Sequence, residues 1–90
     1  MIGAFEEVAI KLEEQGKDAI LFRARAELLK KSAAGSRAAK TAKAYKKEQK
    51  RMRELRAWMD GFLACLRMED VITQEEYLTL YRIMLDMQFH

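Results

Sequence analysis

The 90-residue sequence has no proline, four glycines, one cysteine and one histidine. Without proline and with little glycine, it lacks the residues that punctuate strand-rich or loop-rich folds, which favours long helices. Cys65 has no partner for an internal disulfide, and its place in the apolar run 62–66 predicts a buried, reduced thiol in a cytoplasmic protein. The histidine is His90, the last residue of the sequence, so a catalytic triad or a histidine-based metal site is excluded.

Long apolar runs are also missing. No stretch approaches the roughly 20 apolar residues that a membrane span needs, and residues 1–7 lack the basic region and apolar core of a signal peptide. Adjacent carboxylates occur in several places, but neighbouring residues on a helix point about 100° apart and define no cleft. Glycine-rich phosphate loops and Glu-x-x-His metal motifs are absent from the sequence. We therefore expect no enzymatic activity, no metal, no cofactor and no membrane insertion.

Apolar residues recur every three or four positions through the first two thirds of the chain, as in helices with one buried stripe. The first stripe is Phe5, Val8, Leu12, Ala19, Phe22, Ala26, Leu29 and Ala33, and the second is Ala38, Ala42, Tyr45, Gln49, Met52, Leu55, Met59, Phe62 and Leu66. Between them, Gly35 suits the end of one helix and Ser36 the start of the next. The sequence predicts an all-α fold in which helices over about 2–33 and 36–68 form a long antiparallel hairpin.

Gly16 is the position at which the first helix would otherwise end, because glycine costs up to about 1 kcal/mol relative to alanine inside a helix. The apolar spacing keeps its phase across Gly16, which favours a continuous helix. If the helix breaks there, the residues after Asp18 begin a separate helix, and the architecture becomes a four-helix array.

A short last helix over about 73–87 is indicated by Thr73 and Glu76, which have the spacing of a capping box. It should pack at the open end of the hairpin and complete a single domain. Eight of the eleven residues from Tyr77 to Met87 are apolar or aromatic, more than one buried stripe requires, so we expect a homodimer. The predicted interface residues are Trp58, Phe62, Tyr77, Leu80, Tyr81, Met84 and Met87. Trp58 would alternatively fill the core, and the numerous methionines suit either a loose core or a protein-binding face.

The start of this last helix, Val71-Ile72-Thr73-Gln74-Glu75-Glu76-Tyr77, resembles the I-[ST]-x-E-E-[FY] start of the small C-terminal helical modules called SHOCT domains. The resemblance covers residues 71–85, and Asp70 stands where the family usually has glycine. It implies an oligomerisation or partner-binding role and a bacterial or phage origin.

Charge is strongly segregated along the chain. Residues 23–56 hold thirteen basic and three acidic groups, a net charge of +10, whereas residues 1–22 carry −3 and residues 57–90 carry −4. In a hairpin that closes at Gly35, the basic third is an arm, and the acidic thirds form a hydrophobic base. Clustered lysine and arginine bind a phosphate backbone with little sequence preference. The predicted nucleic-acid-binding residues are Arg37, Lys40, Lys43, Lys46, Lys47, Lys50, Arg51 and Arg53.

The alternative is a solvated helix face whose charges pair across the hairpin. The pairs expected on that interpretation are Glu13 or Glu14 with Arg56, and Asp18 with Arg51 or Arg53. Such pairs would neutralise only a few of the basic groups, which favours an anionic partner. Membrane-surface binding is disfavoured because alanine, and not large apolar residues, lies opposite the charges. Tyr45 either stacks on a base or packs within the hairpin. The second functional hypothesis is a helical adaptor or inhibitor that binds another protein.

Overall fold

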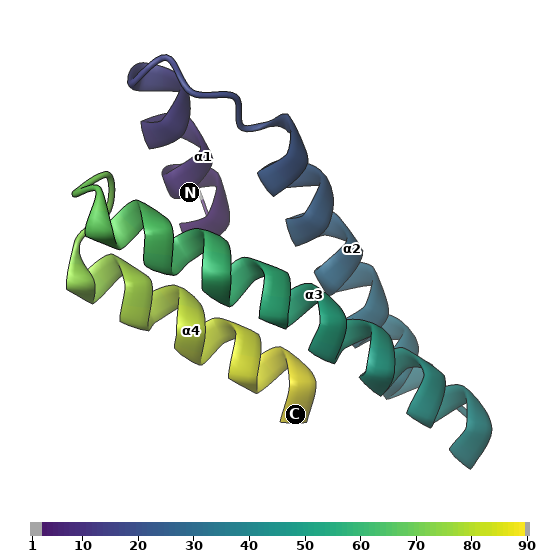
Figure 1. Cartoon of the computed structure of the whole chain (residues 1–90). Coiled ribbons are helices and arrows are strands. Elements are labelled where there is room, and N and C mark those ends of the chain that lie inside the picture. The colour runs from purple at the N-terminus through teal and green to yellow at the C-terminus, as the bar shows by residue number, and fades with distance from the viewer. Residues whose placement is uncertain (1–2, 90) are drawn as a thin grey trace.

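The computed structural model describes residues 3–89, in which four helices follow one another: α1 (Ala4–Glu14), α2 (Ile20–Ala38), α3 (Ala42–Met68) and α4 (Gln74–Phe89) (Figure 1). The predicted helix start at residue 2 and His90 lie outside this range. The all-α prediction is confirmed. The two longest helices, α2 and α3, pack against each other as an antiparallel pair, α1 lies against α2, and α4 lies along α3. The molecule is elongated, with extents of 44 × 23 × 20 Å.

The first helix ends at Glu14, so the predicted continuous helix over about 2–33 is wrong and the four-helix alternative describes the fold. Gly16 has φ +73°, and the Lys17 amide donates to the Leu12 carbonyl at 2.8 Å, which is the hydrogen bond that closes a Schellman motif. The apolar spacing runs on across the break because α1 and α2 both contribute to one core. An apolar spacing that continues across Gly16 therefore does not require an unbroken helix there.

The hairpin reverses at residues 39–41 and not at Gly35, which lies inside α2. Gly35 has a different role: a Cβ at this position would lie 3.1 Å from Cδ of Glu48, so the glycine leaves room for the Glu48 side chain of α3. The start of α3 is set by Thr41, whose Oγ1 accepts a hydrogen bond from the Ala44 amide at 3.1 Å. Gly16 and Gly35, both of which the sequence marks as possible helix ends, thus have different roles.

The predicted capping box of the last helix is confirmed. The Glu76 amide donates to Oγ1 of Thr73 at 3.1 Å, and the Thr73 amide donates to the Glu76 carboxylate at 2.9 Å. Just before it, α3 ends in a second Schellman motif, with Asp70 at φ 60° and the Val71 amide bonded to the Leu66 carbonyl at 2.9 Å. Asp70 thus occupies the left-handed position that glycine favours.

The core contains a row of aromatic rings that links α1, α2 and α3. The ring centroids of Phe5 and Phe22 are 6.2 Å apart, those of Phe22 and Phe62 are 5.6 Å apart, and Trp58 stacks on Phe62 at 5.0 Å. The row ends at the surface, where the Arg25 guanidinium lies 4.5 Å above the Trp58 ring. Cys65 lies on the solvent-exposed side of α3, so the prediction of a buried thiol there is wrong.

Ion pairs fasten α1 to α2. The Arg23 guanidinium contacts Glu6 at 2.6 Å and Glu13 at 2.9 Å, and these hydrogen bonds lower the pKa of both carboxyl groups. The partner of Glu6 and Glu13 is therefore on α2, 17 and 10 residues further along the chain, because the chain folds back at Gly16. The predicted pairs between the first helix and Arg56, Arg51 or Arg53 do not occur among residues 3–89.

Candidate functional site

A polar contact marks the level at which the hairpin leaves the base of the molecule. Nε2 of Gln49 on α3 donates to Oγ of Ser36 on α2 at 3.0 Å and to the Gln88 carbonyl near the end of α4 at 2.8 Å. Beyond this level α4 ends, and α2 and α3 continue together without it (Figure 1). We call residues 37–48 the tip. Ser36 was predicted to cap a helix; it is instead buried within α2.

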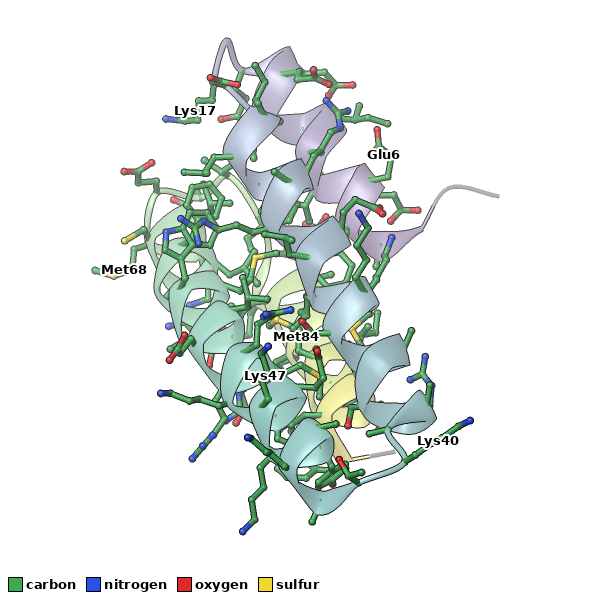
Figure 2. The ribbon with its side chains drawn as sticks, turned by 90° about the vertical axis from the view of Figure 1, so that its right-hand side faces the viewer. Glu6, Lys17, Lys40, Lys47, Met68 and Met84 are labelled. Atoms are coloured by element: carbon green, nitrogen blue, oxygen red, sulfur yellow. The ribbon has the colours of Figure 1, made fainter. Side chains whose placement is uncertain are left out.

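The tip carries five basic residues and one acidic residue, a net charge of +4. The basic residues are Arg37, Lys40, Lys43, Lys46 and Lys47, and all five are exposed. They come from the end of α2, the turn and the start of α3, so the reversal at residues 39–41 brings both helix ends together in one basic cluster. Figure 2 shows Lys40 pointing into solvent at the opposite end of the molecule from Glu6 and Lys17.

On α3, the basic side chains share one face. With 3.6 residues per turn, Lys43, Lys46, Lys47 and Lys50 fall within about 100° of arc. Met52, on the opposite side of the helix, is fully buried. The predicted residues Arg51 and Arg53 are exposed on the two flanks of the same face. All eight residues predicted to bind nucleic acid therefore lie on one continuous solvent-exposed surface made by the tip and the outer side of α3.

Little of this charge is neutralised within the chain. Among residues 3–89, the only one of the eight in an ion pair is Arg51, whose guanidinium lies 3.7 Å from the Glu48 carboxylate. Lysines that are close together on one helix face repel each other and destabilise the helix, unless an anion compensates. Tyr45, 48% exposed, adds one aromatic ring to the tip. The arrangement suits a partner that presents several regularly spaced negative charges.

The residues predicted to form a dimer interface do not form one surface. Leu80 and Met84 are each only 1% exposed and fill the core, so assigning them to an interface is wrong for this conformation. Three others, Phe62, Tyr77 and Met87, are half-buried against the core. Trp58 is also half-buried, with Arg25 over its ring, and Tyr81 is the exposed member of the set at 36%. The apolar residues of α4 lie on more than one side of the helix. Most of these sides are covered, because α1, α2 and α3 all contact α4, and a few of its apolar residues stay exposed.

Sequence reasoning missed a different set of exposed apolar residues. Ile20, Leu21, Leu28 and Met68 are 74%, 54%, 46% and 79% exposed, respectively. The spacing of Leu21 and Leu28, seven residues apart and off the buried stripe of α2, is a sequence pattern that would have revealed them.

No family model matches this chain, and neither the curated proteins nor the solved structures contain a significant match to it. Within residues 3–89 there is no cluster of three or more histidine, cysteine or acidic residues that would hold a metal ion. None of the described helices combines the length and hydropathy of a membrane span.

Proposed function

We propose that this protein is a non-enzymatic accessory protein that binds the backbone of nucleic acids through the tip. The proposal rests on the five exposed basic residues of the tip, which project beyond the four-helix base. Within residues 3–89, none of the five forms an ion pair with an acidic residue. Such a surface displaces condensed counterions from phosphates and gains affinity in proportion to their number.

The shape of the tip favours contact with phosphates over reading of bases. The major groove of duplex DNA is about 12 Å wide and accepts a single helix. The two-helix hairpin is broader than that, because each helix with its side chains is about 10–12 Å across and two of them lie side by side. The basic face of α3 would therefore lie across the backbone, and binding would depend little on sequence.

A salt titration tests the proposal. If the five basic residues of the tip each contact a phosphate of duplex DNA, the logarithm of the association constant should fall with the logarithm of salt concentration with a slope of about −4.5. Replacing Lys43, Lys46 and Lys47 with glutamine should reduce that slope by about 3 and weaken binding at 50 mM salt.

The matched control removes the same number of positive charges elsewhere. Lys17, Lys31 and Arg82 are exposed and lie outside the tip, so the triple substitution to glutamine should leave most of the slope intact. If both triple variants lose affinity equally, binding reflects net charge and the tip is not the site. If the wild-type protein does not bind duplex DNA or RNA at 50 mM salt, the proposal fails.

The second candidate is a helical adaptor or inhibitor that binds another protein, supported by the exposed apolar residues Leu21, Leu28 and Met68. Failure to bind nucleic acid at low salt, with the helical fold intact by circular dichroism, would favour it. A microbial origin and a cytoplasmic location remain predictions of the sequence.

A further inference from the structure

A second surface lies on the outer side of α2 and α3, towards the base. Leu21 and Leu28 lie about one helical turn on either side of Arg25 on α2, and both are exposed. Arg25 reaches over the half-buried Trp58 ring of α3 and so connects the two helices at this surface. Further along α3, Met68 is 79% exposed and points away from the molecule (Figure 2). We call Leu21, Leu28, Trp58, Gly61, Cys65 and Met68 the outer face.

The outer side of α3 changes character along its length. From Lys43 to Glu54 it is charged, whereas Ala57, Gly61, Cys65 and Met68, which follow one another at spacings of three or four residues, are all exposed and uncharged. Contiguous exposed apolar surface marks an interaction site on a protein. The large apolar residues exposed around this stripe are Leu21, Leu28 and Met68. The outer side of this half of α3 is therefore left uncovered by the residues that the structure describes, 3–89.

Gly61 is unexplained by the chain on its own. It lies in the middle of the C-terminal half of the longest helix, where glycine costs up to about 1 kcal/mol relative to alanine. A Cβ at Gly61 would have no atom within 4 Å, so no packing inside the molecule needs the small residue. A helix that approaches from outside would make use of it, because glycine allows two backbones to come close together.

We propose that the outer face is covered by a second copy of this chain, with the two α3 helices antiparallel and crossing near Gly61. The argument for a second copy is charge complementarity along α3. At 1.5 Å per residue, Arg53 lies about 12 Å from Gly61 towards the tip, and Glu69 lies about 12 Å from Gly61 towards the base. Antiparallel pairing brings the Arg53 level of one copy to the Glu69 level of the other.

The same match occurs twice, once on each side of the two-fold axis, since a symmetric dimer uses each contact in both directions. Lys50 and Arg51 would face the neighbourhood of Glu69 and Asp70 of the second copy. The Glu69 side chain is 60% exposed, and among residues 3–89 its ion-pair partner is Lys17 at 3.6 Å, so it is accessible to the second copy. Parallel pairing would instead place basic groups on basic groups and acidic groups on acidic groups.

Molecular mass in solution, measured without nucleic acid, tests this proposal separately from the nucleic-acid proposal. Sedimentation equilibrium of the full chain should give twice the monomer mass of 10.5 kDa, with dissociation promoted by salt. Gly61→Gln places a long neutral side chain at the crossing point and should raise the dimer dissociation constant about tenfold or more, with helical content maintained or increased because glutamine is a better helix former.

Leu28→Gln and Met68→Gln should weaken the dimer as well. Leu78→Gln is the matched control: Leu78 is 39% exposed on α4, outside the outer face, and its replacement should leave the mass unchanged. A wild-type protein that is monomeric at hundreds of micromolar would overturn the proposal. So would a dimer that is indifferent to Gly61→Gln or that is lost in Leu78→Gln.

Disulfide formation tests the antiparallel arrangement. Cys65 and residue 57 lie four residues on either side of Gly61, so Ala57 of one copy reaches the level of Cys65 of the other. Ala57→Cys should therefore form intermolecular disulfides with the native Cys65 on mild oxidation. In the wild-type dimer the two Cys65 residues are separated by about 12 Å along the axis, too far for a disulfide. Rapid disulfide formation by wild-type Cys65, with none gained in Ala57→Cys, would rule out the antiparallel dimer.

Discussion

The two Schellman motifs differ in the residue at the left-handed position, and this difference leads to a pair of predictions in which one substitution lowers stability and the other does not. Gly16 ends α1 at φ +73°, and Asp70 ends α3 at φ 60°. A Cβ at Gly16 would meet no atom within 4 Å, so Gly16→Ala would add backbone strain without a steric clash. The substitution therefore isolates the conformational cost of the helix break.

The magnitude follows from two terms. An alanine held in the left-handed region costs about 1–2 kcal/mol, and the loss of glycine's freedom in the unfolded chain returns about 0.4–1 kcal/mol. Gly16→Ala should lower the free energy of unfolding by about 1 kcal/mol, which is about 4–8 °C in Tm for a domain of this size. Asp70→Gly relieves a smaller strain, because aspartate tolerates this region better than alanine, so stability should stay equal or rise by about 0.5 kcal/mol.

Thermal and urea unfolding followed by circular dichroism, at one protein concentration low enough for the chain to be monomeric, would measure both changes. The comparison is between the two variants: their unfolding free energies should differ by about 1–1.5 kcal/mol, with Asp70→Gly the more stable. If Gly16→Ala melts at the wild-type temperature, α1 and α2 form one continuous helix in solution and the break is not there. If Asp70→Gly is destabilised as much as Gly16→Ala, the left-handed conformation does not determine either effect.

Two further predictions concern the capping box of α4 and the ion pairs of Arg23. Thr73→Ala should cost about 1 kcal/mol in urea unfolding, because it removes the hydroxyl that accepts from the Glu76 amide, and Thr79→Ala, an exposed threonine inside α4, is the control. Since Arg23 depresses the pKa values of Glu6 and Glu13, their contribution to stability should be present above the ordinary glutamate value of about 4.3 and be lost as pH falls through the depressed values. Arg23→Gln should flatten this acid dependence of Tm, and an unchanged profile would show that the two pairs do not act in solution.

Much of the core was predictable because a buried helix face leaves a spacing of three or four residues. All eight members of the first apolar stripe are buried, and in the second the residues Met52, Leu55, Met59 and Leu66 are buried. Ala38, Ala42 and Tyr45 follow the same spacing but are exposed, because the tip has no third helix to cover them. Periodicity identifies a face that is able to pack; whether something packs on it depends on tertiary structure.

The helix boundaries were harder to predict because one residue type serves several purposes. Gly16 and Gly35 both looked able to end a helix, but only Gly16 takes a positive φ, whereas Gly35 provides room for Glu48. The basic site was predictable in composition, since it depends on the sequence of residues 37–53 alone. The ion pairs were not, because Arg23 finds its partners only after the chain folds back at Gly16.

Nucleic-acid binding and dimer formation would both use α3. Going along α3 from Gly61 towards the hairpin turn, the first residue of the tip is residue 48, which is thirteen residues or about 20 Å away. In the other direction, α3 extends only about 10 Å from Gly61 to its end at Met68, so this is how far the second copy's α3 reaches towards the tip. An antiparallel dimer would therefore leave both tips uncovered and pointing in opposite directions, while Lys50, Arg51 and Arg53 turn to the second copy. Each dimer would then bind long DNA through two tips, and its salt dependence should be about twice as steep as that of monomeric Gly61→Gln. Equal slopes for the dimer and the monomeric variant would mean that only one tip contacts nucleic acid at a time.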